Sequence, residues 1–497
     1  MFKKILVANR GDVALRVMRA CRELGVKSVA VYSDADRNAL HVRYADEAYP
    51  VGEGPARVSY LNIGRLIDVA IRSRADAVHP GYGFLAENPR LPQACMEAEI
   101  SFIGPDAEMI RRLGERLRVR EDLQRAGFPV LPASAIGANE SDWHEAAQRL
   151  GFPLVVKPTA GSGGRGERWV GSEENLGELL AAARHEAELA FGDGAVYLER
   201  ALQGVRHIEV QLLADAFGQV ICLGESEGTI QRRHQKLVEE APSPAVSSDL
   251  RTRMQETAIA IARNVDYVGA ATMDFVLDAS GQYYFMHMGP RLHVEHPVIE
   301  MITGLDLVKE QIRIASGRRL RHSQSVVTLR GCAIECRIHA EDPHDGFKPS
   351  TGRISRLSEP SGPGVRVESG VGEGSEISHY YDSLISKVVA WGETRGEAIL
   401  RMRRALDEYR IVGVKTNIPF LQQILNRTSF IGGQFDASQA DQYFTMVESN
   451  RDVLREISAV AAVLLTHEAR TRRPRLAEPR KKPSAWKVAG RWEEMSD

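Results

Sequence analysis

The sequence predicts an α/β protein with a doubly wound parallel domain at its N-terminus and a larger mixed α/β region after it. An apolar segment at 4–8, an amphipathic segment at 13–24 and an apolar segment at 28–32 follow the strand–helix–strand order of a parallel sheet. Later segments alternate apolar and polar residues between turn residues, which is typical of antiparallel hairpins.

Size and composition limit the class of protein. The chain has 497 residues, 43% of them hydrophobic, which is enough for several domains with cores of their own. A net charge of −2 gives no overall attraction to nucleic acid or to an anionic membrane. The first apolar run is too short for a signal peptide, and no run reaches the roughly 18 residues of a membrane span. Five scattered cysteines favour a reducing compartment, so we expect a cytoplasmic protein.

The elements follow one another in a consistent order. Residues 1–115 hold the parallel domain, in which the first helix ends at Gly25 and a later strand ends at His79 in a glycine turn. Residues from about 130 to 203 predict a smaller α/β unit. Residues 204–445 predict a larger mixed unit with several hairpins.

The character of the chain changes after about residue 445. Residues 453–468 have the apolar spacing of a helix. Residues 470–497 are basic and interrupted by prolines, which predicts disorder. This tail is either simply solvated or a docking arm for an acidic partner.

A glycine-rich segment follows the apolar strand at 153–156. Lys157 stands at the end of this strand, and the glycines after it allow backbone amides to approach a polyphosphate closely. The spacing matches neither a Walker P-loop nor a dinucleotide fingerprint, and such a loop can be only a flexible turn. Together with Glu199 and Leu202 after the next strand, it predicts a nucleotide lid and hinge. The loop glycines are Gly161, Gly163, Gly164 and Gly166.

A later hairpin carries ionisable residues on one face. If its loop covers 279–282, Asp274 lies directly opposite His287. A purely structural sheet rarely carries such residues, so we expect a site for a metal ion and a phosphate. Three further ionisable residues follow at alternate positions: Arg291, His293 and Glu295.

Two other segments carry cations. Residues 231–236 are expected to form a dense cationic loop, which is either an exposed basic turn or, if Lys236 meets Arg291, an anion clamp. Arg337 is expected on the same strand face as Glu335, and a buried Arg–Glu pair is the structural alternative.

The chain carries a series of ordered motifs: Asn9-Arg-Gly, His79-Pro-Gly-Tyr-Gly-Phe-Leu, Ile103-Gly-Pro, the glycine loop, Gln231-Arg-Arg-His-Gln-Lys, Val294-Glu-His-Pro, Glu300-Met-Ile-Thr-Gly and Tyr380-Tyr-Asp-Ser-Leu-Ile. Together these motifs resemble biotin carboxylase, the ATP-grasp component of acetyl-CoA, acyl-CoA and pyruvate carboxylases. The resemblance runs from residue 1 to about 440. It implies an N-terminal domain at 1–115, an ATP-grasp domain at 116–320 with its lid at about 130–203, and a C-terminal domain at 328–440. Residues 445–497 are expected to form the helix and tail.

The resemblance also implies roles for individual residues. Glu295 would be the general base that deprotonates bicarbonate, and Arg337 would stabilise the enolate oxygen of biotin. Bicarbonate would be held by Lys236, Arg291, His293 and the Val294 backbone. ATP would be held by Arg116, Lys157, the loop glycines, Glu199, Leu202, His207, Gln231 and His234.

The metal-binding positions depart from the family pattern. Two glutamates and a nearby asparagine normally hold two magnesium ions on the phosphates, whereas Asp274, His287 and Gly289 stand here. Imidazole nitrogen is a poor ligand for magnesium, so manganese is the alternative metal. The segment Gly224–Gly228, expected to be a loop, lacks a cation of the family pattern. Two further departures are Arg116 for a lysine and His293 for a glutamine.

We therefore expect ATP-dependent carboxylation of biotin on a separate biotin carboxyl carrier protein. A separate carboxyltransferase would complete an acyl-CoA carboxylase, first of all the acetyl-CoA carboxylase of fatty acid biosynthesis. The alternatives are the biotin-carboxylating component of a pyruvate carboxylase, a catalytically impaired regulatory subunit, and a ligase for another acceptor. Arg19 and Glu23 match homodimer positions of the family. A zinc site of His287, His293 and His296 is disfavoured, because strand alternation would put His296 on the other face.

Overall fold

A computed structural model describes residues 1–136, 140–159, 166–233, 235–437 and 451–471. The chain divides into a first unit, residues 1–444, and a second unit, residues 445–497, and each is described by itself. Several predictions lie outside the described residues: those for Gly161, Gly163, Gly164, His234 and the basic residues after 471.

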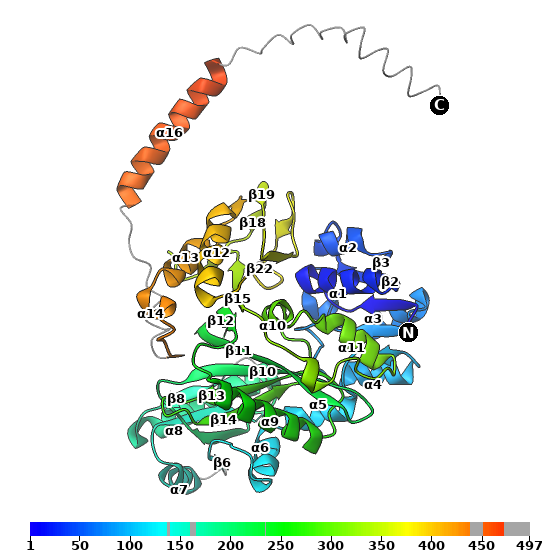
Figure 1. Cartoon of the computed structure of the whole chain (residues 1–497), viewed down its shortest axis with the longest axis vertical. Coiled ribbons are helices and arrows are strands. Elements are labelled where there is room, and N and C mark those ends of the chain that lie inside the picture. Colours follow the sequence, from blue (N-terminus) through cyan, green and yellow to red (C-terminus); the bar gives the residue numbers. More distant parts are fainter. Residues whose placement is uncertain (137–139, 160–165, 234, 438–450, 472–497) are drawn as a thin grey trace. The chain divides into compact units, whose positions relative to one another are not determined.

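The N-terminal domain is the predicted doubly wound parallel sheet, with strand order β3-β2-β1-β4-β5 (Figure 1). Both of its faces are buried: Ile5 and Val7 face one core with α1, whereas Leu6 and Val29 face the other with α3. The elements are β1 (Lys4–Val7), α1 (Gly11–Glu23), β2 (Lys27–Ser33), α2 (Leu40–Tyr44), β3 (Glu47–Gly52), α3 (Ile63–Ser73), β4 (Ala77–His79), α4 (Arg90–Glu97) and β5 (Ser101–Phe102).

Two helices lead from this domain to a small antiparallel sheet with strand order β6-β9-β7-β8. Leu154, Val156 and Leu198 of this sheet pack on Leu180 of α8. The elements are α5 (Ala107–Gly114), α6 (Arg116–Arg125), β6 (Ala133–Ala135), α7 (Glu140–Leu150), β7 (Leu154–Pro158), β8 (Arg168–Val170), α8 (Leu176–Phe191) and β9 (Val196–Arg200).

An eight-stranded antiparallel sheet, in the order β14-β13-β10-β11-β12-β15-β22-β20, forms the centre of the first unit. Leu212 and Met273 on one face pack on α9, and Leu213 and Val389 on the other face pack in the core that contains α10 and α11. The elements are β10 (Arg206–Ala214), β11 (Val220–Arg232), β12 (Gln235–Ala241), α9 (Ser248–Asn264), β13 (Gly269–Leu277), β14 (Tyr283–Gly289), α10 (His296–Thr303), α11 (Leu307–Ala315), β15 (Cys332–His339), β20 (Val365–Ser369) and β22 (Leu384–Gly392).

Short strand pairs and helices complete the C-terminal part, and the second unit contributes one described helix. This helix includes the predicted range 453–468, and its apolar residues Ile457, Val460 and Leu464 are exposed. The elements are β16 (Glu341–Asp342), β17 (Lys348–Pro349), β18 (Gly352–Arg353), β19 (Arg356–Ser358), β21 (Glu376–Ile377), α12 (Arg395–Glu408), β23 (Arg410–Val412), α13 (Ile418–Leu425), α14 (Thr428–Ile431) and α16 (Arg451–Thr471).

Three local expectations are corrected. The segment Gly224–Gly228 is not a loop but the middle of β11, where Glu225 and Glu227 are buried against Arg251 and Arg206. Most of the basic segment 231–236 belongs to the ends of β11 and β12, not to a long loop. Residues 290–295 have no strand alternation, and His296 is separated from His287 because it begins α10.

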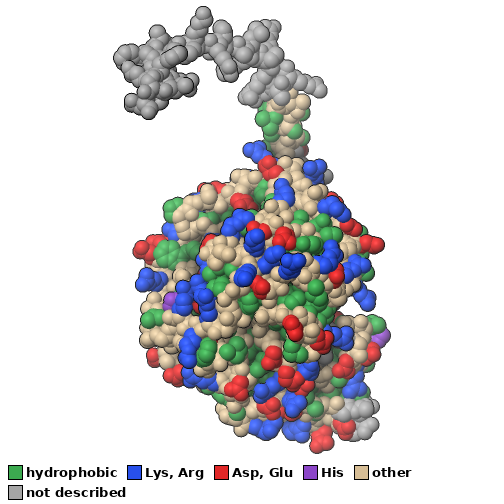
Figure 2. Space-filling model, turned by 90° about the vertical axis from the view of Figure 1, so that its right-hand side faces the viewer, with side chains coloured by type: hydrophobic (Ala, Val, Ile, Leu, Met, Phe, Trp, Pro, Cys, Tyr) green, Lys and Arg blue, Asp and Glu red, His purple; other side chains and the backbone are tan. Residues whose placement is uncertain are grey.

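The visible surface agrees with a net charge close to zero, because Figure 2 shows basic and acidic side chains interspersed over that face. All five cysteines are free and form no disulfide. None of the helices in the described ranges is long and apolar enough to cross a membrane.

Candidate active site

Three neighbouring strands place three ionisable side chains in one row. Glu209 on β10 is paired with Asp274 on β13, and Asp274 is paired with His287 on β14, as the hairpin pattern predicts. His287 Nδ1 lies 3.5 Å from Asp274 Oδ2. Burial raises the pKa of Asp274, but the His287 hydrogen bond and Lys236 outweigh it and lower the pKa to about 2.

Glu295 lies beside this row, at the N-terminus of α10. Its Oε1 accepts a hydrogen bond from Lys236 Nζ at 2.7 Å and lies 2.9 Å from His293 Nδ1. Lys236 also contacts Glu209. Burial raises the pKa of Glu295, but Lys236, His293 and Arg337 hold it well below its usual value. The carboxylate is therefore ionised at neutral pH and can accept a proton.

Arg337 holds the second oxygen of Glu295. Its guanidinium donates to Glu295 Oε2 at 3.1 Å and also contacts Glu239. Glu335, on the same strand face as predicted, lies 3.7 Å from Arg337 Nε. Burial raises the pKa of Glu239 to about 7, although Arg337 opposes the shift. Burial also raises the pKa of Glu335 well above its usual value, and Glu239, its direct cross-strand partner, adds to this shift.

Lys236 and Arg291, the two cations of the predicted anion clamp, are each paired with carboxylates of the protein. Arg291 Nε donates to Glu87 Oε1 at 2.7 Å. Burial raises the pKa of Glu87, but Arg291 outweighs this effect and lowers the pKa to about 2. Arg291 also lines a cavity of about 340 Å³ together with Val294 and Arg337. The cations expected to hold bicarbonate thus lie around one region, each paired with a carboxylate.

The lid side forms a second cluster. Lys157 Nζ donates to Glu199 Oε1 at 2.8 Å, and Arg120 lies 2.7 Å from the other oxygen of Glu199. Burial lowers the pKa of Lys157, but Glu199 outweighs it and raises the pKa. Arg116 begins α6 and lines a cavity of about 690 Å³ with His287 and Arg291.

The remaining predicted nucleotide residues in the described ranges lie on strands β10 and β11 or outside strands. Gln231 is paired with Lys236 across β11 and β12, and His207 is half-buried on β10. Leu202 follows β9 and packs in an apolar cluster with Leu131 and Val276. Gly166 lies in the turn before the lid strand β8, with a positive φ of 77°.

Sequence reasoning missed Lys387, which is fully buried on β22. Its Nζ donates to the carbonyl of Val294 at 2.9 Å and lies 2.9 Å from Glu368 and 3.5 Å from Asp12. Lys387 therefore fixes the backbone next to Glu295. The signal was present in the sequence, since Leu-Ile-Ser-Lys-Val-Val-Ala places one lysine inside an apolar strand.

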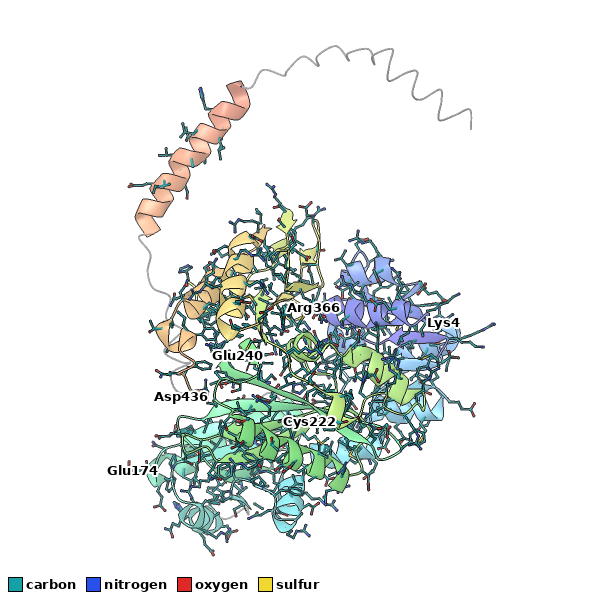
Figure 3. The ribbon with its side chains drawn as sticks, viewed as in Figure 1. Lys4, Glu174, Cys222, Glu240, Arg366 and Asp436 are labelled. Atoms are coloured by element: carbon teal, nitrogen blue, oxygen red, sulfur yellow. The ribbon has the colours of Figure 1, made fainter. Side chains whose placement is uncertain are left out.

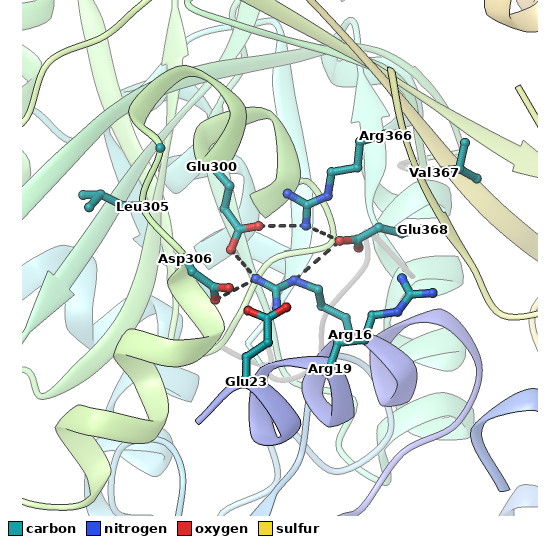
Figure 4. Close-up of a pocket in the computed structure, with 10 residues that line it drawn as sticks. Arg16, Arg19, Glu23, Glu300, Leu305, Asp306, Arg366, Val367 and Glu368 are labelled. Carbon is teal, nitrogen blue, oxygen red and sulfur yellow. Dashed lines mark hydrogen bonds and ion pairs between the residues drawn. The ribbon is translucent and has the colours of Figure 1, made fainter. Parts of the chain in front are cut away.

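A pocket of about 320 Å³ lies where the C-terminal part meets α1. Arg16 lies 2.8 Å from Glu300 and 2.7 Å from Asp306, and Arg366 lies 2.8 Å from the other oxygen of Glu300 (Figure 4). Figure 3 shows Arg366 between the C-terminal part of the first unit and the N-terminal domain that carries α1. Glu368 contacts both arginines as well as Lys387, so this ion-pair network continues toward the Glu295 loop.

Comparisons with known proteins agree with this architecture. The model of the biotin carboxylase N-terminal domain matches residues 1–110, and that of the carbamoyl-phosphate synthase L chain ATP-binding domain matches residues 115–323. The model of the biotin carboxylase C-terminal domain matches residues 335–442.

Whole-length relatives and solved structures are similar over most of the chain. A biotin carboxylase from Nostoc sp. is 51% identical over 438 residues, covering 88% of this chain and 98% of the relative. A pyruvate carboxylase subunit from Methanothermobacter thermautotrophicus is 49% identical over 460 residues, covering 92% and 93%. The crystal structure of the Hydrogenobacter thermophilus 2-oxoglutarate carboxylase biotin carboxylase domain dimer, with MgADP, ADP and bicarbonate, has a TM-score of 0.87 at 46% identity and covers 90% of this chain and 100% of that one.

The parallel N-terminal domain, the small lid sheet and the large antiparallel sheet, with these matches, define an ATP-grasp ligase. More particularly, the chain belongs to the biotin carboxylase family.

Proposed function

We propose that this chain carboxylates biotin on a separate carrier protein, with ATP and bicarbonate as the other substrates. The observation that carries the proposal is Glu295, a buried carboxylate bonded to Lys236 on one oxygen and to Arg337 on the other. This arrangement places a proton acceptor between two cations. The acceptor can remove the proton of bicarbonate, and the cations can stabilise the negative charge on bicarbonate and on the ureido oxygen of biotin.

Bicarbonate is proposed to bind between Lys236, Arg291 and the Val294 backbone, with His293 beside them. A bound anion offsets part of the positive charge that now depresses the pKa of Glu295, and so makes Glu295 a stronger base. Glu295 then takes the bicarbonate proton, and the resulting oxyanion attacks the γ-phosphorus of ATP. The bond from this phosphorus to the bridging oxygen breaks, so ADP leaves and carboxyphosphate forms. Carboxyphosphate then gives its carboxyl group to the ureido nitrogen of biotin, and phosphate leaves with the proton of that nitrogen.

Arg337 is proposed to stabilise negative charge on the ureido oxygen of biotin. Its guanidinium is held by Glu239, Glu335 and Glu295, so its position is fixed before the substrate binds. It lines the same cavity as Arg291 and Val294, which brings biotin next to the bicarbonate site.

ATP is proposed to lie between the lid sheet and the large sheet. Lys157 contributes a buried ammonium to the phosphates, and Glu199 and Leu202 flank the adenine, with His207 and Gln231 nearby. Arg116 contributes to the lowered pKa of Glu199 and lines the cavity that also includes His287. The loop glycines and His234 complete this proposed set.

Magnesium fits this site poorly. Asp274 supplies carboxylate oxygen, but His287 supplies nitrogen and Gly289 supplies no side chain, whereas magnesium prefers an octahedral set of oxygens. The H. thermophilus structure, in contrast, contains ADP as its magnesium salt. In this chain the proton transfer by Glu295 and the charge stabilisation by Arg337 rest on protein groups alone.

The carrier and the transferase are proposed as separate chains, and acetyl-CoA is the first acceptor to test. Pyruvate is the second, because the relative from M. thermautotrophicus, 49% identical over 460 residues, is named for a pyruvate carboxylase. A homodimer is also proposed, since the H. thermophilus domain is a dimer and Arg19 and Glu23 line the pocket beside Arg366. Assembly of Lys236, Glu295 and Arg337 favours an active enzyme over an impaired regulatory subunit.

The test is ATP hydrolysis by the full chain with free biotin and bicarbonate, each omitted in turn, in magnesium and then in manganese. Hydrolysis that requires both supports the proposal. ATP binding without biotin-dependent hydrolysis in either metal would establish the regulatory alternative instead. Carboxyl transfer in the presence of the carrier and each transferase then identifies the acceptor.

A further inference from the structure

The row Glu209–Asp274–His287 and the loop residue His293 surround one small region of the sheet. One ligand atom from each of Glu209, Asp274 and His293 lies within 4.8 Å of the others. Two ligands on opposite sides of a transition-metal ion are about 4.4 Å apart, so this spacing fits a single ion after a small adjustment.

Two polar atoms in this region are buried without a hydrogen-bond partner. His293 Nε2 is one of them, in a side chain that is only 5% exposed, and Asp274 Oδ1 is the other. Buried polar atoms normally have partners, so an unpartnered imidazole nitrogen and an unpartnered carboxylate oxygen on two residues of this cluster point to a bound cation.

His293 is oriented as a metal ligand is. Its Nδ1 lies 2.9 Å from Glu295 Oε1 and 3.3 Å from Glu209 Oε2, so a carboxylate accepts its N–H and leaves the Nε2 lone pair free. Metal-binding histidines are usually held in this way by a carboxylate on the other ring nitrogen.

Gly289 makes room for this ring. A Cβ atom at position 289 would lie 2.7 Å from His293 Nε2 and 3.6 Å from His287 Cε1. The two imidazoles therefore border the same space, and any side chain at this position would fill it. The backbone of Gly289 does not need a positive φ, so its role is the space it leaves open.

We propose that Glu209, Asp274 and His293, with His287 beside Asp274, form a protein-bound centre for a divalent transition ion of the Zn²⁺ and Co²⁺ class. Glu209 is shared with Lys236. An imidazole and two carboxylates suit such ions, whereas magnesium accepts imidazole poorly. The centre lies in the proposed active site, but it forms without nucleotide, so its binding is measured independently of the proposed reaction.

The test is isothermal titration of the metal-free full chain with Zn²⁺, Co²⁺, Mn²⁺ and Mg²⁺, without ATP, biotin or bicarbonate. We expect Zn²⁺ and Co²⁺ to bind at one site at least about tenfold more tightly than Mg²⁺, with the Co²⁺ absorption spectrum of nitrogen ligation. Equal affinity for Mg²⁺, or a Co²⁺ spectrum without nitrogen ligands, would overturn the centre even if the enzyme is active.

Variants locate the ion. His293→Gln should weaken Co²⁺ binding at least about tenfold, whereas His344→Gln, at an exposed histidine, should leave it unchanged. Gly289→Ala should weaken binding by crowding the ring, and the double variant should lose little more than His293→Gln alone. Unchanged Co²⁺ affinity in a folded His293→Gln variant contradicts the proposal. If the variants do not fold, the relative affinities of the unaltered chain for Zn²⁺, Co²⁺, Mn²⁺ and Mg²⁺ test the proposal instead.

Discussion

Glu295 connects the groups that carry charge in this site. One oxygen faces Lys236 and His293, and the other faces Arg337, so each proton or anion that reaches the site changes the field on the same carboxylate. At the scale of a single residue, a change at Glu295 therefore alters its interactions with Lys236, His293 and Arg337 at once.

Glu295→Gln should reduce hydrolysis of ATP that depends on biotin and bicarbonate by at least about 100-fold, because the amide cannot accept the bicarbonate proton. ATP binding should remain. Rates and nucleotide affinity are measured together, with the exposed Glu376→Gln as the matched control. A rate near that of the unaltered chain would show that another group removes the proton.

Residues within sequence motifs could be predicted, and their distant partners could not. The pairing of Asp274 with His287 follows from strand alternation and a short turn, and the structure confirms it. Glu87, which holds Arg291, and Arg120, which holds Glu199, lie far from those residues in sequence. Local patterns carry no information on such pairs, since folding alone brings them together.

At the scale of the element, β22 places a charged side chain in the core. Lys387 has no exposed surface, and its ammonium is satisfied by Glu368, Asp12 and the Val294 carbonyl. A buried ammonium is stable only with such partners, so the stability of β22 depends on the segments that carry Glu368, Asp12 and Val294.

Lys387→Met should lower the free energy of unfolding by about 3–5 kcal/mol, because it leaves Glu368 buried without this cation. Combining it with Glu368→Gln should recover part of the loss. Urea unfolding measures both, and Lys348→Met, on an exposed pair with Asp345, should change stability by less than about 0.5 kcal/mol. A similarly small effect for Lys387→Met would mean that the buried charge is dispensable.

Strand β11 shows where element prediction fails. Two glycines and two glutamates within Gly224–Gly228 indicate a loop by composition. In the structure, Arg206 and Arg251 neutralise the two glutamates, and Gly224 accommodates the Leu329 side chain, 2.9 Å from where a Cβ would lie. Tertiary partners thus override a local pattern that is otherwise sound.

At the scale of the whole molecule, buried carboxyls link stability to pH. The pKa of Glu239 is raised to about 7 from an ordinary 4.5, so the folded state binds more protons there than the unfolded state between these values. Its contribution to stability is complete below about pH 4.5 and is lost as the pH rises toward 7.

The stability of the unaltered chain minus that of Glu239→Gln should therefore fall as the pH rises from about 4.5 to about 7, by at most about 3 kcal/mol. Unfolding curves at several pH values give this difference. Glu174→Gln, at an exposed site, should show no such trend. A difference that grows with pH would mean that Glu239 is ionised in the folded protein.

The proposed dimer is also a property of the whole molecule. Arg19→Glu should weaken self-association in sedimentation equilibrium, because it reverses the charge of an exposed residue beside Glu23 and Arg366. Arg72→Glu is the control, since α3 packs on the opposite face of the parallel sheet from α1. A monomeric unaltered chain would exclude the dimer outright.

The empty space at Gly289 makes positions 289 and 293 depend on each other. The family resemblance places asparagine at position 289 and glutamine at position 293. With the imidazole of His293 in its present place, a side chain at position 289 would collide with it, since even its Cβ would lie 2.7 Å from Nε2. Glycine at 289 and histidine at 293 are therefore sterically coupled, and restoring a side chain at 289 alone would displace the ring of His293.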